Sequence, residues 1–255
     1  MSTLLEVKNL TVRFGGVTAV DNVSFRIEKG ELAGLIGPNG AGKTTVFNLV
    51  SGVYGAVSGE IVYDGKRIDK LKTYQIVPLG IARTFQNLRL FGGSTVLENV
   101  MTAAQNFHKY SFAEAVTHLG RWKKFEAEIR GESMTLLERV GLADRAEQTA
   151  GTLPYGLQRR LEIARALALR PVLLLLDEPA AGMNPEEVVE LNELISGIHR
   201  DFKLTILLIE HHMDVVMNIC SHVVCINFGA KIADGTAQEV QNNPEVLAAY
   251  LGEEE

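Results

Sequence analysis

One short run of residues near the start of the chain has the composition of a phosphate-binding loop. Gly37-Pro38-Asn39-Gly40-Ala41-Gly42-Lys43-Thr44 matches the pattern G-x-x-x-x-G-K-[ST]. Glycines let backbone N–H groups turn toward phosphate oxygens, where a side chain would block them. Lys43 would place its charge on the outer phosphates, and the Thr44 hydroxyl would bind Mg²⁺. The run predicts a triphosphate site; an incidental glycine-rich turn is the alternative.

A second chemical signal lies where an apolar run ends in two carboxylates. Val172 to Leu176 leads directly into Asp177 and Glu178. A phosphate-transfer site of this kind needs an acidic group beside the metal, at the end of a neighbouring buried strand. Asp177 is predicted on the metal side, and Glu178, one residue further, is placed to polarise an attacking water. Pro179 shows that the chain turns here, so helix capping by the two carboxylates is the alternative.

The predicted site requires a strand, a loop and a helix in that order, and the sequence supplies them. Leu32 to Ile36 is a compact apolar run before the loop, and Thr44 to Val50 has the pattern of a helix. As far as Tyr63, short alternating runs separated by glycines predict antiparallel strands. From about Thr95 to Leu142, a capping residue and long stretches without proline predict a mainly helical region.

The last third of the chain returns to alternating strands and helices. Strands are expected at Val172 to Leu176, Leu204 to Ile209 and Val223 to Phe228, with a long helix from about Pro185. Apolar residues of that helix recur at the spacing of one helical face: Val188, Leu191, Ile195, Ile198 and Phe202. The predicted fold class is therefore α/β with a parallel central sheet.

Composition narrows the class of protein. The net charge of −6 and the lack of a basic block argue against a large nucleic-acid footprint. No apolar stretch approaches the ~18 residues of a membrane-spanning helix, and Met1 to Asn9 lacks the features of a signal peptide. Cys220 and Cys225 have no metal or redox spacing, which favours buried, reduced thiols and a cytosolic location.

The order of these motifs resembles the nucleotide-binding subunits of ABC transporters over nearly the whole chain. The matching residues are Gly37 to Thr45, Gln86, Leu153 to Arg160, Asp177-Glu178-Pro179 and His211. The resemblance implies ATP and Mg²⁺ as cofactors and a single ABC ATPase domain over residues 1–255. It also implies a P-loop core with an antiparallel β subdomain at 1–92 and 160–255. An inserted helical subdomain is expected at 93–159.

The resemblance also assigns roles to residues outside the loop. Thr45 would join the phosphate site, and Gln86 would contact both Mg²⁺ and the attacking water. His211 would donate to the γ-phosphate, and Phe14 would stack on adenine. Without the resemblance, the alternatives are a solvated loop position for Gln86, a structural role for His211, and a core or edge position for Phe14. Adjacent His212 stands where many relatives carry an acid, a change without an explanation.

Two segments depart from the family pattern. Where the family usually has Leu-Ser-Gly-Gly-Gln, this chain has Leu153-Pro154-Tyr155-Gly156-Leu157. Pro154 removes a hydroxyl and a backbone donor from a segment that reaches the ATP of a partner subunit, whereas Gly156 keeps an N–H at a helix start. Asn184 lacks the charge of the aspartate common there. These changes suggest a heterodimer with two unequal ATP sites.

Several stretches narrow the resemblance to Liv-type ATPases of branched-chain amino acid uptake. They are Arg83 to Phe91, Tyr155-Gly156, Ala180 to Pro185, Ile209 to His211, the tail from Asn243 to Gly252, and a helical insert around Ser111 to Gly131. The resemblance implies a second, different ATPase subunit, two membrane permeases and an extracytoplasmic binding protein. It places the chain on the cytoplasmic face of the plasma membrane.

Two other functions share much of this pattern. One is an ABC ATPase for lipid or lipopolysaccharide export, and the other is a soluble ABC protein of DNA repair or translation. Soluble ABC proteins of DNA repair or translation usually carry two ATP cassettes or a long coiled coil, which this chain lacks. Leu88, Leu90 and Phe91 are expected to offer an apolar patch to a permease helix. The alternative is that these side chains cover the protein's own insert.

Overall fold

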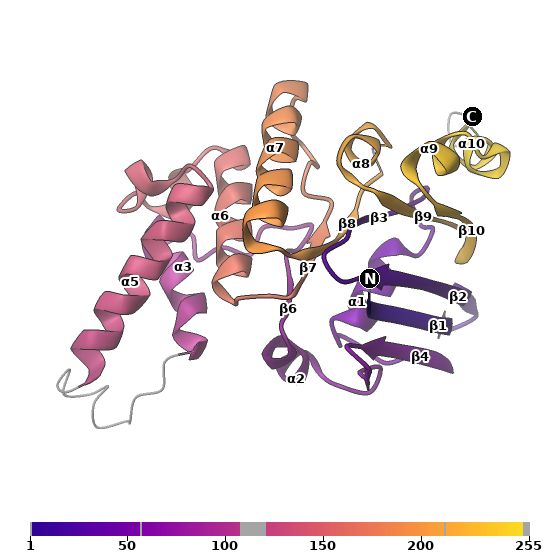
Figure 1. The fold of residues 1–255 in the computed structure, drawn as a ribbon. Coiled ribbons are helices and arrows are strands. Elements are labelled where there is room, and N and C mark those ends of the chain that lie inside the picture. Colours follow the sequence, from indigo (N-terminus) through magenta and orange to yellow (C-terminus); the bar gives the residue numbers. More distant parts are fainter. Residues whose placement is uncertain (1, 57, 108–120, 212, 252–255) are drawn as a thin grey trace. The chain divides into compact units, whose positions relative to one another are not determined.

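A computed structural model describes residues 2–56, 58–107, 121–211 and 213–251. Its contacts divide the chain into two compact units (Figure 1). The first unit combines Met1–Gln86 with Val172–Glu255, and the second is Asn87–Pro171. The strands and helices that flank the predicted phosphate loop and the acidic pair all belong to the first unit. This unit alone therefore positions the loop and the two carboxylates.

The centre of the first unit is a six-stranded sheet in the order β10-β9-β3-β8-β7-β6. All neighbours are parallel except β10, which pairs antiparallel with β9. Every residue of β3, β7 and β8 is buried, as expected for parallel strands covered on both faces. This confirms the predicted α/β class. The strands are β3 (Leu32–Ile36), β6 (Ile81–Arg83), β7 (Leu173–Asp177), β8 (Thr205–Ile209), β9 (His222–Asn227) and β10 (Ala230–Gly235).

A second sheet of the same unit is antiparallel and four-stranded, in the order β2-β1-β4-β5. Its strands are β1 (Thr3–Phe14), β2 (Val17–Glu28), β4 (Ser58–Tyr63) and β5 (Lys66–Arg67). They are longer than the short runs predicted, because β1 and β2 continue through irregularities in their pairing. The antiparallel region before Tyr63 is confirmed.

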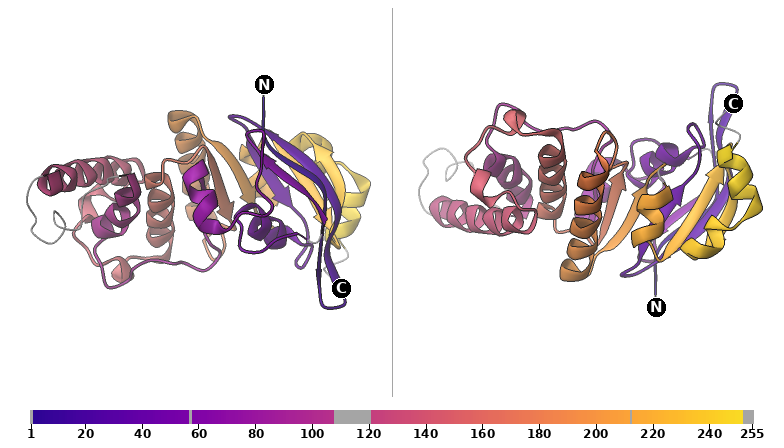
Figure 2. Two further views of the ribbon diagram at one scale, coloured as in Figure 1. Left: turned by 90° about the horizontal axis from the view of Figure 1, so that it is seen from below. Right: turned by 90° about the horizontal axis from the view of Figure 1, so that it is seen from above.

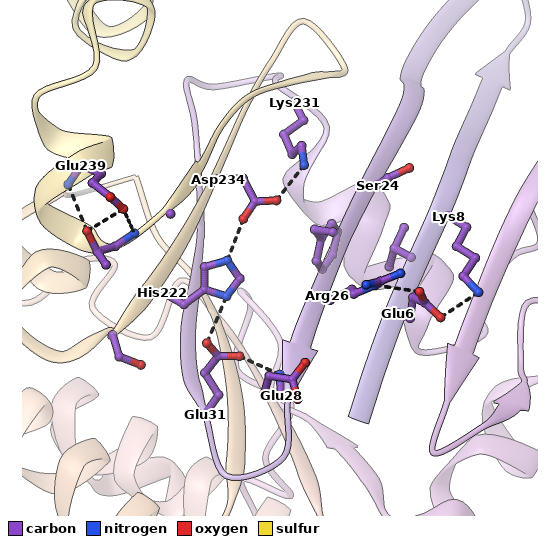
Figure 3. Close-up of a pocket in the computed structure, with 15 residues that line it drawn as sticks. Glu6, Lys8, Ser24, Arg26, Glu28, Glu31, His222, Lys231, Asp234 and Glu239 are labelled. Atoms are coloured by element: carbon purple, nitrogen blue, oxygen red, sulfur yellow. Dashed lines mark hydrogen bonds and ion pairs between the residues drawn. The ribbon is translucent and has the colours of Figure 1, made fainter. Parts of the chain in front are cut away.

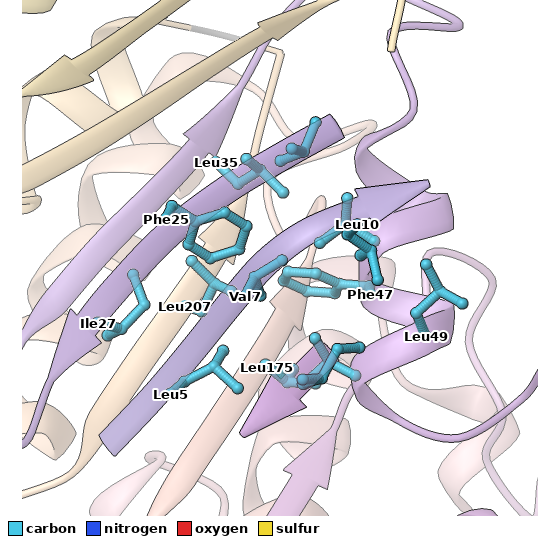
Figure 4. Close-up of a cluster of buried hydrophobic side chains, with 14 of the residues drawn as sticks. Leu5, Val7, Leu10, Phe25, Ile27, Leu35, Phe47, Leu49, Leu175 and Leu207 are labelled. Atoms are coloured by element: carbon cyan, nitrogen blue, oxygen red, sulfur yellow. The ribbon is translucent and has the colours of Figure 1, made fainter. Parts of the chain in front are cut away.

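One hydrophobic cluster joins both sheets through α1 (Lys43–Val50), the helix after the phosphate loop. Figure 4 shows Phe47 of α1 beside β1, with residues of the parallel sheet in the same cluster. Phe47 is fully buried. The same cluster contains residues from both sheets: Leu5, Val7, Leu10, Leu35, Leu175 and Leu207. The start of α1, and with it the end of the phosphate loop, is therefore fixed by the core of the unit.

The remaining helices of the first unit are α2 (Thr73–Ile76), α7 (Pro185–Phe202), α8 (Met213–Ile219), α9 (Ala237–Gln241) and α10 (Pro244–Leu251). In α7, Leu191, Ile195 and Ile198 are buried, which confirms the centre of the predicted apolar face, whereas Val188 is half-buried and Phe202 is exposed. Asn184 caps this helix: its Oδ1 accepts from the Glu187 N–H at 2.9 Å, and Glu187 accepts from the Asn184 N–H at 3.0 Å. The residue that replaces an aspartate of the family thus has a local structural role as an N-cap.

The second unit is helical, as predicted for the middle of the chain. It contains α3 (Val96–Ala104), α5 (Arg121–Arg139) and α6 (Tyr155–Ala168), which lie side by side in Figure 1. The predicted cap of α3 is present, because the Thr95 hydroxyl accepts from the Glu98 N–H and Glu98 accepts from the Thr95 N–H. Of the predicted insert Ser111 to Gly131, residues 111–120 lie outside the described residues, and the rest belongs to α5.

Among the described residues, the burial of the two cysteines and the exposure of Phe91 bear on the predictions made from the sequence. Cys220 and Cys225 are buried and unbridged, as predicted, and burial raises the pKa of the Cys225 thiol to about 12. Phe91 of the predicted apolar patch is half exposed, with the Arg165 guanidinium 5.0 Å from its ring centre. Across the described helices, none combines the length and apolar character needed to span a bilayer.

A cluster of charged side chains links strands β9 and β10, at one edge of the six-stranded sheet, to the turn before β3 (Figure 3). His222, at the start of β9, contacts Asp234 of β10 at 2.8 Å through Nε2 and Glu31 at 3.2 Å through Nδ1. Lys231 pairs with the other oxygen of Asp234 at 2.6 Å. These contacts raise the pKa of His222 to about 9, the hydrogen bond with Asp234 having the largest effect and that with Glu31 following. The folded protein therefore favours the imidazolium form.

Replacing His222 with glutamine is expected to destabilise the protein in a pH-dependent way. A raised histidine pKa contributes stability that is complete below its ordinary value of 6.5 and is lost as the pH rises through about 9. Allowing for partial solvent screening, the loss near pH 6 should be about 1–2 kcal/mol. Urea unfolding of both proteins at pH 6 and pH 9.5 measures it. A stability difference of equal size at both pH values would contradict the charged role of His222.

Candidate functional site

The phosphate loop takes the shape that its glycines permit. It leaves β3 at Gly37 and enters α1 at Lys43, one residue before the expected start of the helix. Gly37 has φ 146° and Gly42 has φ 103°. A Cβ on Gly37 would lie 1.9 Å from the Ile226 carbonyl oxygen, and one on Gly42 would lie 2.4 Å from that of Ala19. Both positions therefore require glycine, for space as well as for backbone conformation.

Lys43 is held against the loop from which it starts. Its side chain is buried, and Nζ donates to the carbonyl oxygens of Gly37, at 2.5 Å, and Pro38, at 2.9 Å. The Ala41 N–H donates to the Pro38 oxygen at 3.1 Å, which closes the turn inside the loop. The ammonium thus lies within the curl of the backbone, where it supplies positive potential to any anion that the loop amides accept.

A cavity of about 280 Å³ brings most of the predicted residues together. Its lining joins the loop to three residues from other parts of the chain: Ala19, Asn39, Gly40, Ala41, Gly42, Lys43, Thr44, Thr45, Gln86 and Glu178. Every one of these except Ala19 was a candidate from the sequence. Ala19 lines the cavity because it lies on β2, beside Gly42. Its residue type carries no chemical signal in the sequence. The cavity has the size and the donor-rich lining that a group of phosphates needs.

Gln86 and Glu178 meet in this cavity. Gln86 Nε2 donates to Glu178 Oε2 at 2.7 Å. Glu178 is 9% exposed and has φ 45°, a left-handed conformation that is unfavourable for a residue with a side chain. Its N–H donates to the Ile209 carbonyl at the end of β8, and the following turn is fixed by Glu210, which accepts from the Ala180 N–H at 2.9 Å. Neighbouring groups thus hold the Glu178 carboxylate at the cavity.

Asp177 does not line the cavity and is paired with Arg83, a residue with no predicted role. Arg83 Nη2 contacts Asp177 Oδ2 at 2.6 Å, and both side chains are at least 94% buried, with exposures of 6% and 2%. Arg83 also donates to Asn48 Oδ1 at 2.7 Å and to Ser51 Oγ at 2.9 Å. Its guanidinium lies 5.1 Å from the ring centre of Phe85. In the sequence, Arg83 stands out as the start of the stretch Arg83 to Phe91 that resembles Liv-type ATPases, and as an arginine at the end of a short apolar strand.

The other candidates of the first unit do not line the cavity. His211 follows β8 as predicted, with its side chain 34% exposed and Nδ1 3.9 Å from Glu210 Oε2. Phe14 ends β1, is about half exposed, and meets the edge of Tyr54 with ring centres 5.3 Å apart. Its environment is that of a partly covered surface aromatic. His212 lies outside the described residues.

Gly156 belongs to the second unit, where it is the second residue of α6. Pro154 is the N-cap and provides no side-chain cap, so the first N–H groups of α6 lack the partner that a serine would supply. The adjacent Tyr155 hydroxyl accepts from Arg159 at 2.9 Å, and Arg159 is fully buried against Glu162 at 2.7 Å. Tyr155, one of the residues that depart from the family pattern, thus takes part in the packing of this helix.

The donor set of the cavity fits Mg²⁺ bound together with a phosphate ligand. Mg²⁺ takes oxygen ligands and commonly uses one or two protein groups beside phosphates and waters. Thr44 and Gln86 line the cavity and carry such oxygens. No group of three or more His, Cys, Asp or Glu side chains suited to a metal occurs within the described ranges. The cavity therefore offers Mg²⁺ oxygen atoms of Thr44 and Gln86, beside those of a phosphate ligand.

Comparisons with known proteins agree with this geometry. The family described as ABC transporter matches residues 20–181, and that described as branched-chain amino acid ATP-binding cassette transporter matches 230–255. The high-affinity branched-chain amino acid transport ATP-binding protein BraF of Pseudomonas aeruginosa is 46% identical over 98% of both chains. LivG of Escherichia coli, with the same description, is 44% identical over 98% of both. An ATP-binding cassette of an ABC transporter, solved in its ADP conformation, superposes with a TM-score of 0.86 at 30% identity, covering 99% of this chain and all of that one.

Proposed function

The chain belongs to the ABC transporter family as one of its ATPases, and we propose that it drives the uptake of branched-chain amino acids through separate membrane permeases. The observation that carries the ATPase part is the cavity where the phosphate loop, Gln86 and Glu178 meet. The substrate class is supported by the full-length similarity to BraF and LivG and by the match of residues 230–255 to the branched-chain family. Export of lipid or lipopolysaccharide has no comparable support.

The proposed roles follow from where each side chain lies. Lys43, Thr44, Thr45 and the loop amides bind the phosphates of ATP, because they line the cavity at a helix N-terminus. Glu178 orients the attacking water, and Gln86, hydrogen bonded to Glu178, holds that carboxylate toward the phosphates. His211 acts from the end of β8 as a donor to the γ-phosphate. Phe14 contacts adenine from the edge of β1.

Mg²⁺ would neutralise charge on the phosphates when it is bound with ATP. Thr44 and Gln86 are its proposed protein ligands, and Asp177 acts on its surroundings from the end of β7. The ion pair with Arg83 fixes the orientation of the Asp177 carboxylate, which is 1% exposed. Arg83 is therefore proposed as the residue that positions Asp177.

The proposed assembly places the chain on the cytoplasmic face of the membrane, beneath two permease subunits. An extracytoplasmic binding protein delivers the amino acid. The second ATPase is proposed to be a different subunit, because Pro154 deprives the start of α6 of a side-chain cap and of one backbone donor. In a head-to-tail dimer that helix start would face the ATP of the partner, so two copies of this chain would form two impaired sites.

Affinity purification from detergent-solubilised membranes, with a tag on this chain and MgATP present, tests the proposal. Co-purification of two hydrophobic permeases and a different ATP-binding subunit is the expected result. Recovery of lipid-export components, or of ribosomes or DNA, would replace the proposed function with one of its alternatives. Size-exclusion chromatography of the pure Glu178→Gln chain in MgATP tests the heterodimer separately. A stable ATP-dependent homodimer would contradict it.

A further inference from the structure

The C-terminal helix reaches the first residue of the phosphate loop. On α10, the Tyr250 hydroxyl accepts a hydrogen bond of 2.9 Å from the Gly37 N–H, across 213 residues of sequence. Gly37 is buried, and a buried backbone N–H without a partner is costly. Tyr250 supplies that partner from outside the loop. It does not line the cavity, so any effect on nucleotide must pass through the backbone of Gly37.

The helix that carries Tyr250 is anchored beside β9 and β10. Val246 of α10 is fully buried, and both α9 and α10 contact the edge of the parallel sheet, as the yellow segments of Figure 2 show. α9 begins with a complete capping box between Thr236 and Glu239, which fixes where this helix starts. The Tyr250 hydroxyl is therefore carried by a helix that packs on the sheet.

Gly37 lies between Tyr250 and the loop lysine. Tyr250 binds its N–H, while Lys43 Nζ donates to its carbonyl oxygen. On the third side lies the Ile226 carbonyl of β9, which a Cβ on Gly37 would approach to 1.9 Å. The backbone from which the loop curls is thus held by contacts from the tail, from the loop lysine and from the sheet.

We propose that Tyr250 is a positioning residue of the nucleotide site, through which the C-terminal helix sets the affinity of the loop for ATP. The inference rests on the proposed function, because it assumes that the loop binds ATP. Without the hydroxyl, Gly37 keeps its glycine freedom but loses one restraint, and the loop must be ordered when nucleotide binds. The loss of one neutral hydrogen bond predicts that ATP binding weakens about fivefold.

The test compares Tyr250→Phe with Tyr74→Phe in the full-length chain. Tyr74 of α2 is 71% exposed, so its variant loses the same hydroxyl without touching the loop. ATP affinity is measured by equilibrium titration in a Glu178→Gln background, which prevents turnover, and kcat and KM are measured in otherwise unaltered protein. Tyr250→Phe should raise Kd and KM about fivefold with kcat within about twofold, and Tyr74→Phe should match the parent.

A second readout does not depend on ATP. Hydrogen exchange of the nucleotide-free protein should be faster across residues 36–42 in Tyr250→Phe than in Tyr74→Phe, because the Gly37 N–H has lost its acceptor. Equal exchange and equal ATP affinity in the two variants would overturn the inference while leaving the ATPase intact. A fall in kcat at unchanged KM would also overturn it. If the parent protein bound no ATP, the proposed function itself would fail.

Discussion

Glu178→Gln is expected to abolish ATP hydrolysis while leaving ATP binding intact. The carboxylate is held at the cavity by its left-handed backbone and by Gln86, 2.7 Å away. Glutamine keeps the side-chain length and an oxygen that can accept from Gln86, but it lacks the charge that polarises water. The loss of a positioned base predicts a fall in turnover of about 100- to 10,000-fold.

Steady-state phosphate release and equilibrium ATP binding measure the two halves of this prediction. Glu186→Gln is the matched control, because it makes the same chemical change at an exposed position in the first turn of α7. It should hydrolyse ATP at the parental rate. If Glu178→Gln retained more than about a tenth of the parental turnover, Glu178 would not be the group that activates water.

Arg83→Met is expected to be among the most destabilising single substitutions in the first unit. It would leave Asp177 buried at 1% exposure without its partner at 2.6 Å, and would remove the contacts to Asn48 and Ser51. Breaking one side of a buried ion pair costs about 3–5 kcal/mol. Turnover should fall as well, because the Asp177 carboxylate would lose its fixed orientation beside the site.

A double-mutant cycle in urea unfolding separates the pair from simple loss of packing. Asp177→Asn combined with Arg83→Met removes the unpaired charge, so the double variant should be more stable than Arg83→Met while its turnover stays below that of the parent. Arg26→Met is the surface control, since Arg26 is 68% exposed in its pair with Glu6 and should have little effect. A stability of Arg83→Met within about 1 kcal/mol of the parent would contradict the role of the pair.

The parts of the site that are local in sequence could be predicted from it. The spacing from Gly37 to Thr44 specifies both the loop and its chemistry, and a run of buried residues ending in Asp177 and Glu178 identifies a strand end. The parallel sheet followed from strand and helix alternation. The boundaries moved by a residue or so: β7 begins at Leu173, and α1 begins at Lys43.

The parts that depend on strand order could not be predicted. Arg83 reaches Asp177 because β6 pairs with β7 in a register that sets Arg83 against Leu175. That register depends on the packing of the whole sheet. The contact between Tyr250 and Gly37 likewise depends on where α10 packs. Capping by Asn184 is local in sequence, and an asparagine directly before Pro185 and the long helix is a recognisable N-cap signal.

Uptake of radiolabelled leucine, isoleucine and valine by cells of the native host tests most directly whether this ATPase drives an amino-acid importer. The gene is deleted and then restored as the parental chain, as Glu178→Gln or as the control Glu186→Gln. The parental chain and Glu186→Gln should restore saturable uptake of these amino acids, and Glu178→Gln should not, although it is expressed at the same level. Unchanged high-affinity uptake in the deletion strain, or full restoration by Glu178→Gln, would contradict the proposed function.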